Sequence, residues 1–215
     1  MVYSSRAPSC GNDMTRINFI LDNIPDDKQK ILDVGCWEGT YSQMYKKRTN
    51  TVYAIEGSKS AAERAAEKGI IVECGNFVEN DFFPNMLFDV IVAGEIIEHV
   101  FDPDMFIEKV RRMLAHQGKL IITTPNVVSL PRRVLMLFGK NPSLENRVSK
   151  ESAGHIRYFT FEEMERLLQD HGFEIIRSVS DVVNFNGAGT LYSTLIPRLF
   201  KRWGRSIMII ARKVS

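Results

Sequence analysis

Short apolar runs alternate with amphipathic segments along this chain of 215 residues. Apolar runs of strand length predict strands, and they occur at 31–34, 51–55, 70–73, 88–93, 119–123, 173–179 and 206–212. Segments with apolar residues at helical spacing lie between them, at 13–23, 40–47, 59–68, 104–114 and 161–171. This alternation predicts an α/β fold with a doubly wound, mostly parallel sheet of seven strands.

Capping residues mark several of the helix boundaries. Ser58 is an N-cap type of residue before the third predicted helix, and Gly69 ends that helix. Thr160 has the same place before the last predicted helix. The length suits one domain with a full α/β core, so we expect residues 1–215 to form a single domain.

A glycine-bearing turn follows the first predicted strand. Two glycines, Gly35 and Gly39, lie in the run Asp33-Val34-Gly35-Cys36-Trp37-Glu38-Gly39 between a strand and a helix. Such a turn lets the backbone approach a ligand closely at a helix N-terminus. About 20 residues further on, the second strand ends in Glu56, the place where nucleotide-binding folds hold a ribose diol. We therefore expect a nucleoside-containing ligand here.

The turn differs from a dinucleotide-binding fingerprint. That fingerprint is G-x-G-x-x-G, whereas here Trp37 holds its third position and position 40 is not a glycine. Asp33 would repel an anionic pyrophosphate, but it suits a ligand with a cationic amino or sulfonium group. An NAD(P)-dependent oxidoreductase is therefore the less favoured alternative.

The residues from Asp33 to Gly39 resemble the first motif of the class I S-adenosylmethionine (SAM)-dependent methyltransferases, with Trp37 in place of the usual middle glycine. The resemblance implies a Rossmann-like sheet of seven strands. It also implies SAM as cofactor and S-adenosylhomocysteine (SAH) as product. The methionine end of SAM would be held by Asp33, Gly35, Cys36, Trp37 and Gly39. Glu56, with Gly57 beside it, would then bind the ribose hydroxyls.

Two further segments resemble motifs of the same family. Gly75-Asn76-Phe77 follows the third predicted strand, where related enzymes carry Gly-Asp-hydrophobe. The resemblance implies that the Asn76 amide bonds to adenine and that Phe77 lies against the ring. The alternative is a turn residue followed by a core residue. After the fourth strand, Gly94 and Glu95 would face the methionine end of SAM.

Two histidines are the candidate catalytic residues. Glu98-His99-Val100 resembles a segment of ubiquinone-type O-methyltransferases, which implies that His99 acts as a general base or orients the acceptor. His155 lies in a His-x-Arg-x-Phe-Thr segment that resembles one in related small-molecule and sugar methyltransferases. By the same resemblance, Asn126 lies at the mouth of the acceptor site. The simpler alternatives are a histidine bonded to backbone and a loop whose aromatic residues fix the next helix.

The alternation of strands and helices lapses at about 127–154. Here an apolar stripe at 130–139 includes Arg132 and Arg133. Insertions at this point roof the acceptor in the family that the chain resembles, so we expect an acceptor-site lid. Its composition suits an apolar or lipid-like acceptor, and its basic residues could meet an anionic headgroup through peripheral contact with a membrane. An ordinary amphipathic lid helix explains the same pattern.

Composition and charge narrow the function further. A formal net charge of +2 does not require a nucleic-acid partner, and no apolar run reaches the roughly 18 residues of a membrane span. The three cysteines have no Cys-x-x-Cys spacing, so we expect neither disulfides nor a metal site, and a reducing, cytoplasmic setting is the default. We therefore expect methyl transfer from SAM to a small-molecule acceptor, at a hydroxyl oxygen. A non-catalytic protein that binds SAM or a partner is the second alternative, and the oligomeric state is left open.

Overall fold

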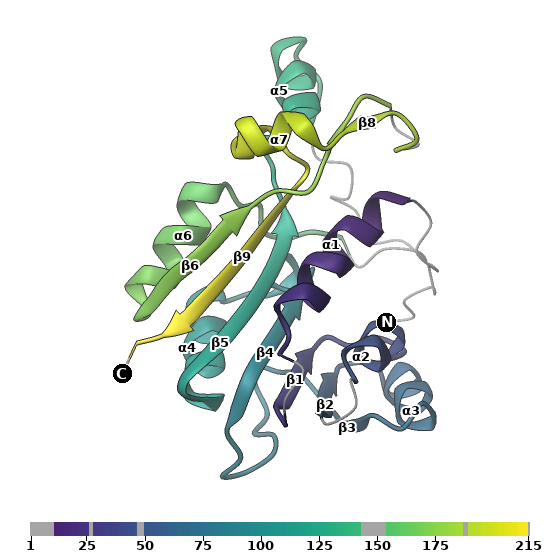
Figure 1. Ribbon diagram of the computed structural model, residues 1–215, viewed down its shortest axis with the longest axis vertical. Helices are drawn as coiled ribbons and strands as arrows, with labels where there is room; N and C mark the ends of the chain where they lie inside the picture. The colour runs from purple at the N-terminus through teal and green to yellow at the C-terminus, as the bar shows by residue number, and fades with distance from the viewer. Residues whose placement is uncertain (1–10, 26–27, 47–49, 143–153, 187–188, 215) are drawn as a thin grey trace.

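A computed structural model of the chain describes residues 11–25, 28–46, 50–142, 154–186 and 189–214. Its centre is a seven-stranded sheet with the order β3-β2-β1-β4-β5-β9-β6 (Figure 1). These strands are β1 (Lys30–Val34), β2 (Thr51–Glu56), β3 (Ile71–Cys74), β4 (Phe88–Gly94), β5 (Leu114–Pro125), β6 (Phe173–Val179) and β9 (Ser206–Lys213). Neighbours pair in parallel except at β9, which runs antiparallel to β5 and β6. The predicted doubly wound, mostly parallel sheet is confirmed.

Helices cover both faces of the sheet. They are α1 (Gly11–Asn23), α2 (Thr40–Tyr45), α3 (Lys59–Glu67), α4 (Pro103–Met113), α5 (Leu130–Leu137), α6 (Phe161–Asp170) and α7 (Leu195–Leu199), with the short 3₁₀ helices η1 (Ile97–His99) and η2 (Lys201–Trp203). Figure 1 shows α1 in front of the sheet and α4 and α6 behind it. Among the helices of the described residues, none is long and apolar enough to cross a membrane.

Successive residues of the central strands point to opposite faces, which gives the protein two apolar layers. Leu32 of β1 belongs to the layer that includes Phe106 of α4. Its neighbour Ile31 belongs to the other layer, which includes Ile17 of α1. These side chains are at most 1% exposed, and burying one such side chain contributes about 1.5 to 3 kcal/mol.

Two expected helix caps have different outcomes. Thr160 accepts a hydrogen bond from the Glu163 backbone N–H, and the Glu163 carboxylate accepts one from the Thr160 N–H, so a complete capping box begins α6. Ser58 stands at the N-cap position of α3, but its side chain makes no capping bond. Its hydroxyl is instead 3.3 Å from the Ser60 hydroxyl.

One end of the molecule lies beyond the carboxyl ends of β4 and β5. Here α5, α7 and a small antiparallel pair, β7 (Val183–Asn184) with β8 (Tyr192–Ser193), gather at the top of Figure 1. The expected lid at 127–154 includes α5, whereas its residues 143–153 lie outside the described residues. The lid therefore stays a prediction.

Candidate active site

The turn between β1 and α2 is built around two glycines in left-handed backbone conformations. Gly35 has φ +79°, and a Cβ there would lie 2.9 Å from Ile96 Cδ1. Gly39 has φ +72°, and a Cβ there would lie 2.9 Å from Ala65 Cβ of α3. Side chains at these two positions would push the turn away from its neighbours, so glycine is required for this path.

Trp37 takes the place between these glycines. Its φ is +53°, so the backbone adopts the left-handed conformation that a glycine adopts readily. A non-glycine residue pays about 1 to 2 kcal/mol for this conformation. The loop is held nevertheless, because the Trp37 N–H donates to Glu56 Oε2 at 2.8 Å.

Glu56 connects the turn after β1 with the residues that follow β2. Besides the bond from Trp37, its other carboxylate oxygen accepts a hydrogen bond from the Ser58 N–H at 2.8 Å. The residue is only 7% exposed and ends β2, while the following Gly57 is exposed. Each carboxylate oxygen has a further lone pair, so Glu56 is fixed in place and still able to accept from ribose hydroxyls.

Asp33 lies beneath the turn, fully within the protein. It accepts a hydrogen bond from the Ser42 hydroxyl at 2.6 Å. Burial, and to a smaller extent the nearby Glu56 carboxylate, raise the pKa of Asp33 to about 7. Burial and the charge of Asp33 also raise the pKa of the Cys36 thiol, which makes that thiol unreactive as a nucleophile.

Asn76 and Phe77 follow β3, as the sequence predicts, but face different surroundings. Asn76 is exposed, and its Oδ1 accepts a hydrogen bond from the Val78 N–H at 3.0 Å. Phe77 is only 8% exposed and packs edge-to-face on Phe106, with 5.1 Å between ring centroids. The structure therefore gives Phe77 the place of a core residue, and its contact with adenine stays a prediction.

Gly94 ends β4 at the centre of the sheet, and Glu95 directly follows it. Glu95 has φ +55°, and its backbone N–H donates to the Thr123 carbonyl at 2.9 Å. Its Oε1 accepts a bond from the Thr123 hydroxyl at 3.0 Å and lies 3.5 Å from Arg16 Nη1. The side chain is thus fixed between β5 and α1.

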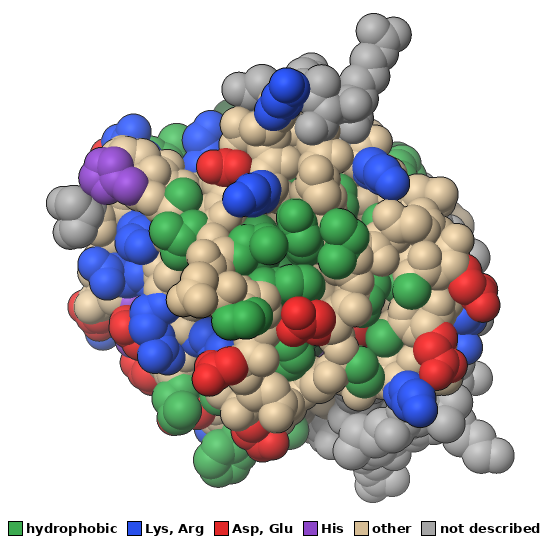
Figure 2. Space-filling view, turned by 90° about the horizontal axis from the view of Figure 1, so that it is seen from below, with side chains coloured by type: hydrophobic (Ala, Val, Ile, Leu, Met, Phe, Trp, Pro, Cys, Tyr) green, Lys and Arg blue, Asp and Glu red, His purple; other side chains and the backbone are tan. Residues whose placement is uncertain are grey.

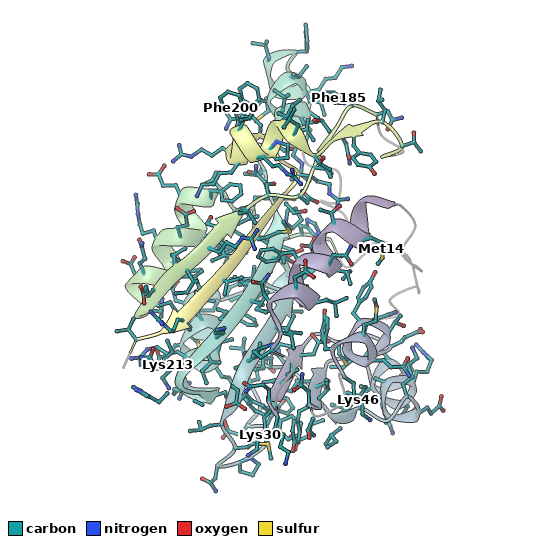
Figure 3. All side chains as sticks on the ribbon, in the orientation of Figure 1. Met14, Lys30, Lys46, Phe185, Phe200 and Lys213 are labelled. Carbon is teal, nitrogen blue, oxygen red and sulfur yellow. The ribbon has the colours of Figure 1, made fainter. Side chains whose placement is uncertain are left out.

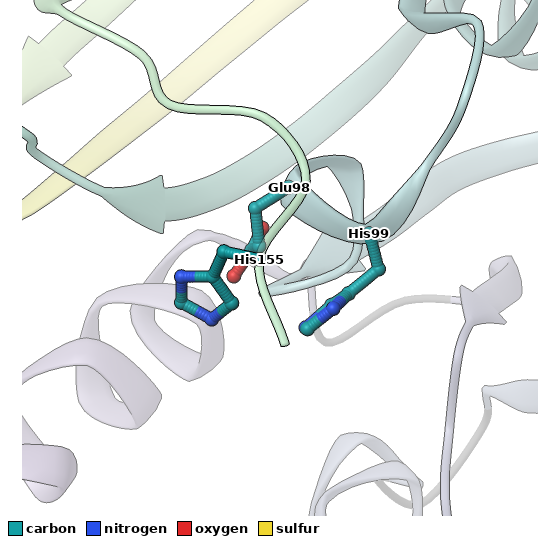
Figure 4. Close-up of side chains that lie close together, drawn as sticks. All are labelled: Glu98, His99 and His155. Atoms are coloured by element: carbon teal, nitrogen blue, oxygen red, sulfur yellow. The ribbon is translucent and has the colours of Figure 1, made fainter. Parts of the chain in front are cut away.

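Glu98, His99 and His155 converge just beyond this point (Figure 4). One oxygen or ring nitrogen from each lies within 4.8 Å of the others. The two imidazole centroids are 4.9 Å apart, and His99 Nδ1 is 2.9 Å from the Gly154 carbonyl oxygen. The structure thus brings the two predicted catalytic histidines together.

Glu98 was not among the expected site residues. It is 1% exposed, its Oε2 accepts a bond from the Thr124 hydroxyl at 2.9 Å, and its Oε1 has no hydrogen-bond partner. Burial and the neighbouring Glu95 raise the pKa of Glu98 well above its usual range. The only feature of the sequence that could have indicated a role for Glu98 in the site is its position directly before His99.

A cavity of about 810 Å³ opens over this cluster. Its polar lining includes Arg16, Glu95, Glu98, His99, His155 and Arg205. Its apolar lining comes from α5 and from the β7 region, and includes Leu130, Val134, Leu135, Val183 and Phe185. A molecule with one polar end and an apolar body fits this division of the lining.

The expected place of Asn126 at the mouth of the acceptor site is wrong. Asn126 has no exposed surface, and its amide donates to the backbone carbonyls of Arg202 at 3.0 Å and Gly204 at 2.8 Å. Its Oδ1 accepts from the Val128 N–H at 3.1 Å. Because every polar atom of the side chain bonds to backbone, Asn126 fixes the end of β5 to η2 and does not face a ligand.

Comparison with known proteins gives a family and a fold. A family model described as a methyltransferase domain matches residues 13–178. A ubiquinone biosynthesis O-methyltransferase from Caulobacter sp. is 32% identical over 108 residues, which cover 47% of this chain and 43% of that protein. The chain spans about half the length of the curated relatives that it matches.

Solved structures share the architecture at low sequence identity. A SAM-dependent methyltransferase from Thermotoga maritima superposes with a TM-score of 0.69 at 20% identity, covering 94% of this chain and 89% of that one. The N-methyltransferase NodS from Bradyrhizobium japonicum, in complex with SAH, has a TM-score of 0.62 at 14% identity and covers 96% and 89%. At these identities the likeness establishes the fold and leaves the acceptor open.

Proposed function

Because the chain belongs to the family of class I SAM-dependent methyltransferase domains, we propose that it transfers a methyl group from SAM to a hydroxyl oxygen of a small molecule. In this proposal the glycine turn with Asp33 holds the methionine end, and Glu56 holds the ribose hydroxyls. The adenine end would lie near Asn76. The cavity over Glu98, His99 and His155 would then hold the acceptor.

The proposed reaction needs little beyond placement and proton removal. The acceptor oxygen forms a bond to the methyl carbon while the bond from that carbon to sulfur breaks, and SAH leaves. The hydroxyl proton passes to His99 or His155, since imidazole is a common general base at neutral pH. Because the methyl group is already activated, holding the acceptor oxygen in line with it supplies much of the rate acceleration.

One observation carries the proposal: the segment after β4 touches both the glycine turn and the cavity. Ile96 lies against Gly35 of the turn, and its neighbour Glu95, which directly follows β4, lines the cavity. Glu98 and His99 follow within one short helix, so a methyl group at the β4 end would lie next to a pair of imidazoles. An oxygen acceptor is supported further by the names of the ubiquinone O-methyltransferase relatives.

We expect the acceptor to be apolar or lipid-like, because the cavity leads to an exposed apolar surface. Half of the twenty large hydrophobic side chains that are exposed in the described residues lie at this end of the molecule. We call this set the apolar rim, and it consists of Val134, Met136, Leu137, Phe138, Phe185, Leu191, Tyr192, Leu195, Leu199 and Phe200. Figure 3 labels Phe185 and Phe200 there.

The charge around the apolar rim suits an anionic membrane surface. No Asp or Glu occurs in the sequence at 127–142 or 182–205, whereas these segments hold seven arginines and lysines. The basic residues are Arg132, Arg133, Lys140, Arg198, Lys201, Arg202 and Arg205. Lys201 pairs with Glu165 and Arg205 with the buried Asp181, so these two add little net charge to the surface. By contrast, the opposite end of the molecule carries acidic and basic side chains around its hydrophobic centre (Figure 2). A surface of exposed apolar and basic side chains is typical of peripheral membrane contact.

Calorimetric titration with SAM and SAH tests the cofactor part of the proposal. We expect micromolar binding to the unaltered chain and at least a tenfold loss in Glu56→Ala, because the ribose hydroxyls lose their acceptor. Glu63→Ala is the matched control, since Glu63 is an exposed glutamate on α3. Equal binding by both variants would refute the assignment of Glu56.

The acceptor is then sought among apolar phenols and catechols, with amines of matched shape as the comparison. Mass spectrometry of the product identifies the methylated atom. Methylation of the hydroxyl compounds alone supports the proposal, and methylation of the amines alone refutes oxygen as the acceptor atom. Tight SAM binding with no product from either set would favour the non-catalytic alternative.

A further inference from the structure

A lysine of α4 is buried against the loop that follows β3. Lys109 is only 8% exposed, although lysine is among the residues least often buried. Its ammonium nitrogen lies over two aromatic rings, 5.4 Å from the ring centroid of Phe77 and 5.5 Å from that of Phe82, and it donates a hydrogen bond to the Asn80 carbonyl. The Asp81 carboxylate, 3.8 Å away, is fully exposed, so that ion pair contributes little. The rings and the carbonyl therefore replace the water that the charge loses on burial.

Asn80 closes this loop into a compact turn. Its backbone N–H donates to the Asn76 carbonyl at 3.0 Å, and its Oδ1 accepts a hydrogen bond from the Asn76 N–H at 3.0 Å. The turn also requires glycine at position 75, because a Cβ there would lie 2.8 Å from Asn80 Oδ1. Lys109 holds the carbonyl of the same asparagine, so one side chain of α4 fixes the residue around which the turn is built.

The same helix also fixes Phe77. Phe106 lies three residues before Lys109 on α4, and its ring contacts Phe77 edge-to-face while the Lys109 ammonium lies over the Phe77 ring. Residues three apart are neighbours on a helix surface, so both contacts come from one side of α4. The loop is thus attached to α4 at Phe77 and at Asn80, whereas Asn76 beside them is exposed. An exposed amide on a fixed loop can bind a ligand without first being ordered.

We propose that Lys109 is a positioning residue for cofactor recognition: it holds Asn76 in the conformation that binds the adenine amino group of SAM. The inference rests on the proposed function, in which the adenine end lies near Asn76. Asn76 Oδ1 accepts a hydrogen bond from the Val78 N–H and has a second lone pair for the adenine amino group. Lys109 itself does not touch the cofactor in this assignment. It acts through Asn80, and without it the turn, and with it the direction of that lone pair, is no longer fixed.

Recognition of the adenine amino group is measured with SAH and S-inosyl-L-homocysteine, in which an oxygen replaces that amino group. Calorimetry of the unaltered chain should show a preference for SAH of about threefold to tenfold, the range for one hydrogen bond. Lys109→Met keeps an unbranched apolar side chain and should lose this preference, whereas Lys109→Arg keeps a cationic donor and should retain part of it. Arg112→Met is the matched control, because it removes an exposed cation from the same helix and should leave the preference unchanged.

Hydrogen exchange measured without ligand reports on the loop itself. Lys109→Met should speed the exchange of the amides at 76–80, and so should Asn80→Ala, which breaks the link to Asn76. A thermal unfolding curve for each variant shows whether a change reflects a loss of folding. Asn80 is exposed, so Asn80→Ala should fold and lose the preference for SAH even if Lys109→Met does not fold.

The outcomes separate the role of Lys109 from the proposed function. A full preference for SAH in either variant, or no preference in the unaltered chain, refutes the positioning role. Unchanged exchange of the loop in Lys109→Met refutes it as well. If the unaltered chain binds neither SAM nor SAH, the proposed function fails, and the exchange data alone decide whether Lys109 holds the loop.

Discussion

On the proposed assignment of Asp33 to the methionine end of SAM, we expect cofactor binding to depend on pH near neutrality. The pKa of Asp33 is about 7, so the side chain is mostly neutral below that pH and charged above it. The amino group of SAM is cationic and favours the charged carboxylate. The affinity for SAM should therefore fall as the pH decreases below 7, by up to about tenfold per pH unit. Titration calorimetry between pH 5.5 and 8.5 measures this dependence.

Asp33→Asn is the control for that prediction. The amide keeps the size of the side chain and cannot titrate, so its affinity for SAM should be lower and nearly independent of pH. SAH retains the amino group and should show the same profile as SAM with the unaltered chain. A pH dependence that survives in Asp33→Asn would assign the titration to another group.

At the level of the elements, α6 and α3 differ in how they begin. The Thr160 hydroxyl caps α6, whereas the Ser58 hydroxyl caps nothing. Thr160→Ala should lower the free energy of unfolding by about 1 kcal/mol, because a backbone N–H loses its partner. Ser58→Ala should lower it by less than about 0.5 kcal/mol. Urea unfolding followed by circular dichroism compares the two, and equal losses would contradict the assignment.

The bounds of strands that form continuous apolar runs could be predicted closely from the sequence. The bounds of strands that depend on pairing with a distant strand could not. The apolar runs of β1 and β4 are visible in the sequence because both faces of these strands are buried. β5 begins at Leu114, before the predicted start at 119, since Leu114 pairs with Phe88 across a shift in register. The short strands β7 and β8 have no apolar period, because two residues each are too few to show one.

The candidate site likewise has one part that could be predicted from the sequence and one part that could not. The glycine turn and Glu56 could be predicted because close backbone approach leaves a signature of glycines and spacing. The convergence of Glu98 with His155 could not, because it depends on how the loop after Gly154 lies against η1. Asn126 was misassigned because its partners are backbone carbonyls of a distant segment, which a sequence motif does not reveal.

At the level of the whole molecule, the apolar rim predicts binding to anionic vesicles. Vesicles that contain phosphatidylglycerol should bind the chain, and vesicles of phosphatidylcholine alone should bind it at least tenfold more weakly. High salt should weaken the first interaction, because the basic residues contribute about 1 kcal/mol each at an anionic surface. Vesicle sedimentation gives the bound fraction directly.

Two variants locate that surface. Leu195 and Leu199 are 63% and 71% exposed, so replacing both with Glu should not unfold the protein and should abolish vesicle binding. Leu87→Glu serves as the matched control, since Leu87 is half exposed just before β4, at the other end of that strand. Retention of vesicle binding by the double variant, or loss of it in the control, would exclude the apolar rim as the contact surface.

The order of the segments along the chain also separates the residues proposed to bind SAM from those that form the apolar walls of the cavity. The turn, Glu56 and Asn76 all precede the end of β4, whereas the apolar walls of the cavity come from segments after Pro125. Codons for the walls can therefore change, or be exchanged as one block between relatives, while the part of the chain proposed to bind SAM is inherited intact. Such modularity lets a single scaffold acquire new acceptors by substitution in its second half.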